Sequence, residues 1–169
     1  MSDNYVELYG VHGTCKDRAE DIKTGGFDLP KGDKGYYGKG VYFYEDSEKG
    51  RRYAFNWAKY HKKCDSPCVI RAEICCSLTN YLDLTSNEIK IKQLIEKCSK
   101  LCSTNKLNFN EEIRKWFISI INANIRNNGA DFHVLKVFVP ENCGHGWDVG
   151  LVVRRPRCIK NQNIIDFKE

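Results

Sequence analysis

The sequence contains no apolar run that approaches the roughly 18 residues needed to cross a bilayer. Its first seven residues, MSDNYVE, have neither the basic nor the apolar segment of a secretory signal peptide. It has four prolines, and it has no internal repeat, low-complexity tract or linker. We therefore expect one domain over residues 1–169, located in the cytoplasm and without a membrane partner.

A strong charge of either sign is also lacking. The 27 Lys and Arg residues exceed the 22 Asp and Glu residues by five, which gives a formal net charge of +5. This mild excess suits an anionic ligand. It does not form the sharp basic stripe that is typical of nucleic-acid binders.

Cysteine, by contrast, is abundant, with nine residues. Without a secretion signal, reduced thiols are the expected state. The nearest approach to a metal pattern is His61, Cys64 and Cys68 followed by the pair at 75–76, but its second half is untidy, and we expect no metal site. Cys98 and Cys102 lie four residues apart on an apolar helix face, which predicts that they are core residues.

The pattern of apolar residues and turn signals predicts short strands with helices between them. Strands are expected at 5–12, 41–44, 68–75, 81–85, 133–139, 151–154 and 164–167, and helices at 15–24, 48–61 and, as an inserted pair, within 86–127. The expected helix N-caps are Thr14, Asp46 or Ser47, Thr85 or Ser86, and Asn110. Glu141–Trp147 is expected to be a loop. The arrangement favours an α+β fold with mainly antiparallel sheets.

One glycine-rich stretch, 34–44, organises the chain. Its glycines at positions 35, 38 and 40 lead into Val41-Tyr-Phe-Tyr44. Glycine allows tight turns and lets a ligand lie against bare backbone, and the aromatic residues that follow place flat rings beside that point. Upstream stands a second short motif, Val11-His-Gly-Thr14, at the end of the first predicted strand.

Together these stretches resemble the catalytic domain of the poly(ADP-ribose) polymerase-like, or diphtheria-toxin-type, ADP-ribosyltransferases. The run 11–14 with Ile22 and Gly26-Phe27 is similar to the family's His-Gly-Ser/Thr, Ile, Gly-Leu/Phe pattern. The run 37–43, YGKGVYF, is close to the family's Phe-Gly-Lys-Gly-Ile-Tyr-Phe. The two motifs cover about a third of the chain, and 86–127 has no counterpart.

The resemblance implies an ADP-ribosyltransferase-like fold that uses NAD as a substrate. It implies that His12 contacts a ribose hydroxyl and Gly13 the nicotinamide carboxamide, and that Tyr42 and Tyr53 stack on the nicotinamide ring. Either Tyr44 or Trp57 is an alternative second wall.

Two further residues are assigned to NAD by resemblance. Thr14 is expected either to hydrogen-bond the ligand or simply to cap a helix. Gly40 is expected to bring backbone close to the ligand. A site of this kind must orient the substrate and stabilise positive charge on the ribose as nicotinamide departs.

The chain departs from the family at its far end. Laid on the family's last strand pair, 151–159 puts Gly150 where the family has a catalytic Glu. Asp148 would point to the same face of a strand, so it is the candidate replacement, with a loop aspartate as the alternative. Gln162 is a more remote candidate.

The missing Glu argues against polymer formation, so we predict a mono-ADP-ribosyltransferase. A catalytically inactive NAD- or ADP-ribose-binding module and an NAD-dependent RNA 2′-phosphotransferase are the alternatives. The last would use arginines such as those at 51–52 and 154–157. A protein or a nucleic acid remains open as the acceptor, and 86–127 or the loop 27–37 is expected to select it.

Overall fold

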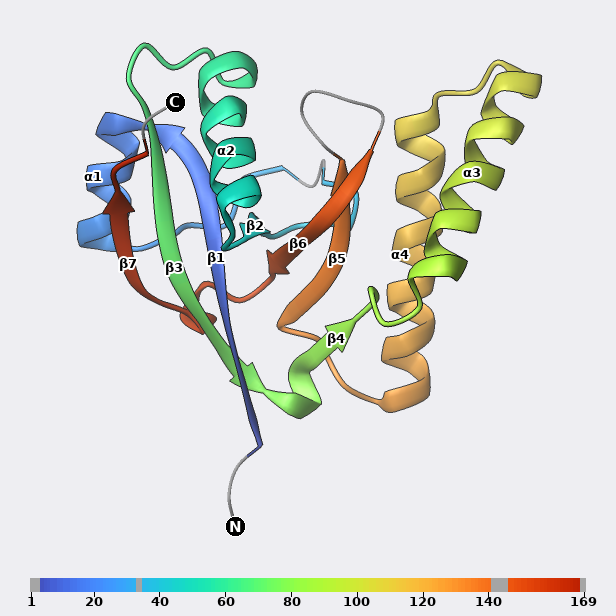
Figure 1. Cartoon of the computed structure of the whole chain (residues 1–169). Helices are drawn as coiled ribbons and strands as arrows, with labels where there is room; N and C mark the ends of the chain where they lie inside the picture. Colours follow the sequence, from blue (N-terminus) through green and yellow to red (C-terminus); the bar gives the residue numbers. More distant parts are fainter. Residues whose placement is uncertain (1–3, 33–34, 141–145, 168–169) are drawn as a thin grey trace.

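The protein, seen in a computed structural model that describes residues 4–32, 35–140 and 146–167, is built on one seven-stranded sheet (Figure 1). Its strands are β1 (Tyr5–Cys15), β2 (Val41–Glu45), β3 (Pro67–Ser77), β4 (Tyr81–Asp83), β5 (Val134–Pro140), β6 (Trp147–Val153) and β7 (Ile159–Ile165). Its helices are α1 (Lys16–Gly25), α2 (Glu48–Asn56), α3 (Glu88–Asn105) and α4 (Phe109–Asn128).

The sheet order is β4-β5-β6-β2-β1-β3-β7. All neighbouring strands pair antiparallel except β4 and β5, which run parallel. The expected α+β class with mainly antiparallel strands is therefore confirmed. Strands β6 and β7 begin earlier than predicted, and residues 141–145 of the predicted loop lie outside the described residues.

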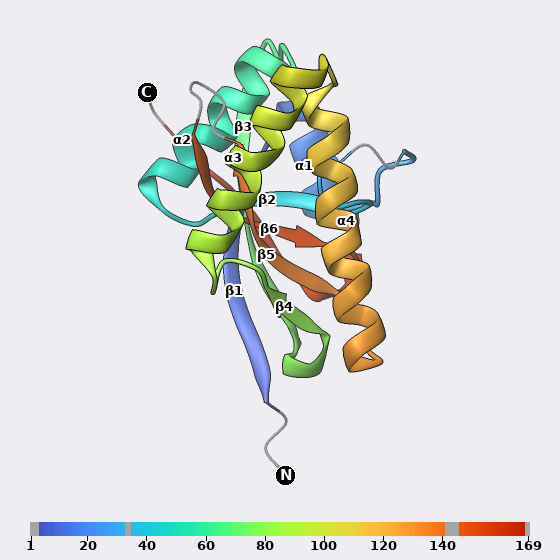
Figure 2. The ribbon, with the colours of Figure 1, turned by 90° about the vertical axis from the view of Figure 1, so that its right-hand side faces the viewer.

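Helices cover both faces of the sheet (Figure 1). Neighbouring residues of β3 point to opposite faces: Ile70 packs with Ile22 of α1, whereas Val69 packs with Ala54 of α2. Figure 2 shows α3 and α4 in front of the β5–β6 half of the sheet. The two helices form their own core with β5 and β6, in which Cys98 and Cys102 are buried as predicted.

The first turn of α1 differs from the prediction. Strand β1 runs on to Cys15, because its pairing with β3 continues through Thr14 and Cys68. Thr14 is therefore a buried strand residue rather than the helix N-cap, which is Cys15. The helix ends as expected at Gly26, whose φ of +81° favours glycine.

The later helix caps were predicted with mixed success. Ser47 does cap α2, since its hydroxyl accepts the N–H of Gly50 at 2.9 Å. Helix α2 then continues as a π-helical turn, Trp57–His61. The predicted caps of α3 and α4 are wrong by a residue or two: α3 starts after Asn87, and Asn108 caps α4.

A disulfide joins Cys15 at the end of β1 to Cys64 beyond the π-helical turn. The expectation that all thiols are reduced is therefore wrong for this pair. These two cysteines are 49 residues apart, so no local sequence pattern links them. Among the described residues, none of the helices is both long enough and apolar enough to cross a membrane.

Candidate functional site

The candidate site lies where the sheet comes apart between β1 and β2. Their ladder consists of the pairs Gly10–Glu45 and Val11–Tyr44, whereas β1 pairs with β3 along its whole length. Just after β2, the backbone N–H of Asp46 donates to the backbone oxygen of Tyr9 in β1 at 3.0 Å. Peptide groups two residues apart face the same edge of a strand, so the N–H and C=O of Gly13 also face this gap, which we call the seam.

The imidazole of His12 bridges the seam. Its Nδ1 lies 2.8 Å from the backbone oxygen of Tyr42, and its ring packs against Phe27 and Phe43. Because a carbonyl oxygen only accepts, Nδ1 carries the proton and Nε2 is left as an acceptor. Burial, reinforced by the nearby Lys62 ammonium, lowers the pKa of His12 to about 4. The ring is therefore neutral at pH 7, and its Nε2 can accept a hydrogen bond from a hydroxyl group.

Lys62, just after the π-helical turn, reaches into the same place. Its Nζ donates to the Gly13 oxygen at 3.0 Å and lies 3.5 Å from Nε2 of His12. Although the residue as a whole is exposed, burial of its ammonium end lowers the pKa of Lys62, and Arg18 lowers it further. The Gly13 carbonyl, which we expected to bind the nicotinamide carboxamide, thus already accepts a hydrogen bond from Lys62.

Two of the glycines assigned to NAD lie where another part of the chain leaves no room for a side chain. A Cβ on Gly13 would overlap the carbonyl oxygen of Ala54 in α2. A Cβ on Gly40 would lie 2.6 Å from Cγ1 of Val152. Close backbone packing therefore accounts for both glycines without a ligand.

The ring of Tyr42 is fixed by the glycine-rich turn that precedes it. Its hydroxyl accepts the N–H of Tyr37 at 3.0 Å and donates to the oxygen of Gly38 at 2.8 Å. Gly38 has a φ of +86°, which requires glycine-like freedom. Because Tyr42 and Tyr44 are two residues apart, they point to the same face of β2.

Asp148 and Tyr53 reach that face from β6 and α2. The Nζ of Lys49 lies 3.1 Å from Oδ2 of Asp148 and 5.3 Å from the ring centre of Tyr53. The rings of Tyr53 and Tyr44 are 5.7 Å apart between centres. Asp148 is therefore a strand residue, not the loop residue that was the alternative. Lys49 contacts both Asp148 and Tyr53 and so links them.

Gly150, the position of the family's Glu, has no space for a side chain. A Cβ there would lie 2.8 Å from the oxygen of Phe43 and 2.8 Å from a methyl group of Val139. Gln162 lies on β7, at the far edge of the sheet, where its side-chain amide N–H donates to the backbone oxygen of Ile22. Of the candidates for the missing carboxylate, Asp148 alone faces the Tyr42 side of β2.

Other predicted candidates lie elsewhere. Trp57 stacks on His61, with 4.6 Å between ring centres. The arginines that an RNA 2′-phosphotransferase would use fall into two groups, since Arg51 pairs with Asp46 and Arg155 with Asp131. In the part of the chain that the structure describes, no group of three or more His, Cys, Asp or Glu side chains could hold a metal ion.

Sequence reasoning missed both lysines. Lys49 could have been found, because it stands four residues before Tyr53 on one helix face. Lys62 carries no such signal, since its partner Gly13 is 49 residues away.

Among known proteins, the chain is similar to a relative whose function is not described. The chain is 34% identical over 110 residues to an uncharacterized protein of Methanocaldococcus jannaschii. The match covers 62% of this chain and 49% of the relative, so the chain spans about half the length of the curated relative that it matches. No family model matches the sequence, and no solved structure matches it.

Proposed function

We propose that the chain is a mono-ADP-ribosyltransferase that binds NAD at the seam, releases nicotinamide and transfers ADP-ribose to a macromolecular acceptor. One observation carries the proposal: the backbone edge of Gly13, the neutral imidazole of His12 and the strand that holds Tyr42 meet where the β1–β2 ladder stops. The two motifs that resemble the family therefore adjoin in space, 30 residues apart in sequence.

The ligand contacts follow from this geometry. The N–H and C=O of Gly13 form a donor and acceptor pair that complements a carboxamide. The Nε2 of His12 accepts a ribose hydroxyl once the ammonium of Lys62, 3.5 Å away, moves aside. Tyr42 and Tyr53 supply flat surfaces for the nicotinamide ring, with Tyr44 beside Tyr53. To bind in this way, the carboxamide must displace the ammonium of Lys62 from the Gly13 oxygen.

Asp148 is the group that we assign to the transfer step. The glycosidic bond breaks, and nicotinamide leaves with the bonding electron pair. The ribose carbon becomes positively charged and bonds to an oxygen or nitrogen of the acceptor. The acceptor's proton passes to the Asp148 carboxylate and then to water. The carboxylate also stabilises the positive ribose, and the Nζ of Lys49, 3.1 Å from Oδ2 of Asp148, holds the carboxylate in position.

Nicotinamide release tests the proposal. The protein is incubated with adenylate-labelled NAD and a cell lysate, and both free nicotinamide and transferred label are measured. We expect both above background in the wild type and neither in the His12→Asn variant, which keeps a donor toward Tyr42. Gln162→Ala, on the far sheet edge, is the matched control and should keep wild-type activity. Absence of both signals in the wild type would overturn the proposal.

A catalytically inactive NAD-binding module is the second candidate. The lack of space for a side chain at Gly150, where the family has its catalytic Glu, favours it. Calorimetry distinguishes the two: an inactive module binds NAD with measurable heat but releases no nicotinamide over hours.

A further inference from the structure

Three arginines gather at the turn between β6 and β7, beside a depression of about 430 Å³. The lining of the depression consists of His133, Arg155, Pro156 and Arg157. Two backbone hydrogen bonds fix the turn: the N–H of Arg154 donates to the oxygen of His133 at 2.8 Å, and the N–H of Cys158 donates to the oxygen of Arg155 at 2.9 Å. The end of β6 and the start of β5 therefore hold the cationic side chains close together.

One carboxylate, that of Asp131, offsets part of this charge. Its Oδ2 accepts from Nη2 of Arg155 at 2.6 Å, and its Oδ1 lies 3.6 Å from Nη1 of Arg154. Arg157 is exposed and makes no hydrogen bond or ion pair with any residue that the structure describes. Three positive charges against one negative charge leave a net charge of +2 when His133 is neutral.

The imidazole of His133 responds to this excess of positive charge. Burial lowers the pKa of His133, and the three arginines lower it further, whereas the carboxylate of Asp131 acts in the opposite direction. An anion bound among these groups would oppose the effect of the arginines. The pKa of His133 should therefore rise when the depression is filled by an anion.

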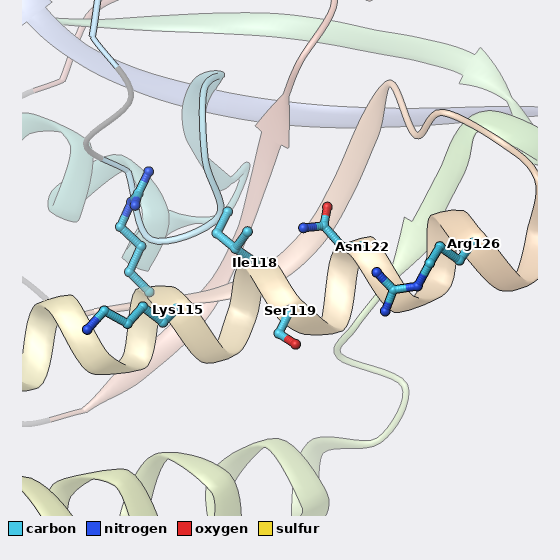
Figure 3. A pocket seen from close by; sticks show the side chains of 6 residues that line it. Lys115, Ile118, Ser119, Asn122 and Arg126 are labelled. Carbon is cyan, nitrogen blue, oxygen red and sulfur yellow. The ribbon is translucent and has the colours of Figure 1, made fainter.

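A depression of similar size, about 450 Å³, lies on the outer face of α4 and also contains three cations (Figure 3). Two of them are engaged within the chain, since Lys115 pairs with Glu112 at 2.6 Å and Arg114 donates to the oxygen of Gly35 at 3.1 Å. At a helical rise of 1.5 Å per residue, its end positions 114 and 126 are about 18 Å apart. The arginines at 154–157 lie within four residues of each other, so the β6–β7 turn is the better place for a compact anion.

We propose that the depression at the β6–β7 turn binds the terminal phosphate of a small phosphomonoester. At pH 7 such a group carries a charge of about −1.5 to −2, which matches the net charge of the turn better than the single charge of a carboxylate or a phosphodiester. Guanidinium groups donate two parallel hydrogen bonds to phosphate oxygens, and Arg157 is the first donor. The volume is that of a small-molecule pocket, so it leaves room for an organic group against the ring of Pro156.

Arg155 is the second donor, and the structure offers a way to release it from Asp131. The Nη1 atom of Arg154 is buried and has no hydrogen-bond partner in the part of the chain that the structure describes. It lies only 3.6 Å from Asp131. A small movement of the carboxylate toward Arg154 would satisfy this buried donor and let Arg155 turn to the phosphate.

Titration with methyl phosphate at pH 7, followed by NMR at the arginine side-chain N–H groups and the His133 ring, tests the proposal. Dimethyl phosphate, a diester with one negative charge, is the matched ligand. We expect methyl phosphate to bind at least about fivefold more tightly and to raise the pKa of His133. Arg157→Gln should raise the Kd of methyl phosphate about tenfold, the lower end of the range for a hydrogen bond to a charged group. Because Arg157 is exposed and unpaired within the described chain, this variant should keep its fold.

The matched control is Arg126→Gln, which removes the same charge from an exposed position in the α4 depression and should leave the Kd unchanged. Three results would overturn the proposal. The first is equal binding of methyl phosphate and dimethyl phosphate. The second is weakening by Arg126→Gln as large as that by Arg157→Gln, which indicates net charge alone. The third is no change in the signals of His133 and Arg157 at any concentration of methyl phosphate. Since the titration contains no NAD, its result is independent of the proposed transferase activity.

Discussion

The ammonium of Lys62 donates to the backbone oxygen of Gly13, 3.0 Å away, and so occupies the acceptor that a carboxamide would use. In the proposed binding mode, nicotinamide competes with this intramolecular bond. We predict that Lys62→Met lowers the Kd of nicotinamide about fivefold, which is close to the roughly 1 kcal/mol typical of one hydrogen bond. Calorimetry with nicotinamide measures this directly, because the ligand is uncharged and does not sense the lost cation at long range.

Lys63→Met is the matched control for that measurement, since it removes the same charge from the next exposed position. It should leave the Kd unchanged. An unchanged or raised Kd in Lys62→Met would show that Lys62 does not compete with the carboxamide. The same variant has a second readout: because the Lys62 charge helps to lower the pKa of His12, that pKa should rise, as followed by NMR.

The low pKa of His12 makes stability depend on pH. Its folded-state pKa of about 4 lies below the ordinary 6.5. Between these values the unfolded chain binds a proton that the folded chain does not, so the free energy of unfolding falls as pH drops from 6.5 toward 4. The loss has an upper limit of about 3 kcal/mol, at about 1.4 kcal/mol per pKa unit.

The variant His12→Asn separates this contribution from that of other groups. Asparagine can still donate to the Tyr42 oxygen but does not titrate, so the fall in stability over this window should flatten. Urea denaturation at pH 7, 6, 5 and 4.5 measures it. His61→Asn, exposed on the π-helical turn, should keep the wild-type slope, and an identical slope in His12→Asn would contradict the assignment.

The Cys15–Cys64 disulfide closes a loop beside the seam, with one sulfur two residues from Gly13 and the other two residues from Lys62. Constraining a loop of 49 residues stabilises the folded state by at most about 4 kcal/mol on the chain-entropy estimate. We predict that Cys15→Ser/Cys64→Ser, or reduction of the wild type, lowers the melting temperature.

Calorimetric melting with and without dithiothreitol measures the effect. The double variant should no longer respond to the reductant. Cys68→Ser changes a free thiol next to the same region and should respond as the wild type does. A wild-type melting temperature that is insensitive to reductant would mean that the bond makes no net contribution to stability.

The sequence was sufficient for features that depend on neighbouring residues. The β-favouring run at 41–44, the Ser47 cap (one of two predicted) and the apolar face of α3 each depend on nearby residues, and the structure confirms all three. Thr14 was misassigned because pairing with β3 overrides its preference for a helix cap. The disulfide and the Lys62–Gly13 bond each join residues 49 apart, so no local pattern could reveal them. Asp148 was already a candidate from the sequence, but whether it lay in a strand or a loop depended on the pairing of β6 with its neighbours.

The carboxylate of Asp148 gives the last prediction. In Asp148→Asn the side chain can still accept the Val149 N–H, and the partly exposed ion pair with Lys49 contributes at most about 1 kcal/mol, so the fold should persist. Loss of a general base typically lowers the rate 10²–10⁴-fold, so nicotinamide release should fall by about that factor. Initial rates at saturating NAD measure it, with Asp131→Asn as the control that removes a carboxylate paired with Arg155 instead.

Gly150→Glu tests the same assignment from the opposite side. It restores a Glu at the family's position, but its Cβ would be only 2.8 Å from the Phe43 oxygen and from a Val139 methyl group. We expect destabilisation of about 1–3 kcal/mol from this overpacking and no recovery of activity in the Asp148→Asn background. Restored nicotinamide release in Gly150→Glu/Asp148→Asn would show that position 150, rather than 148, holds the functional carboxylate.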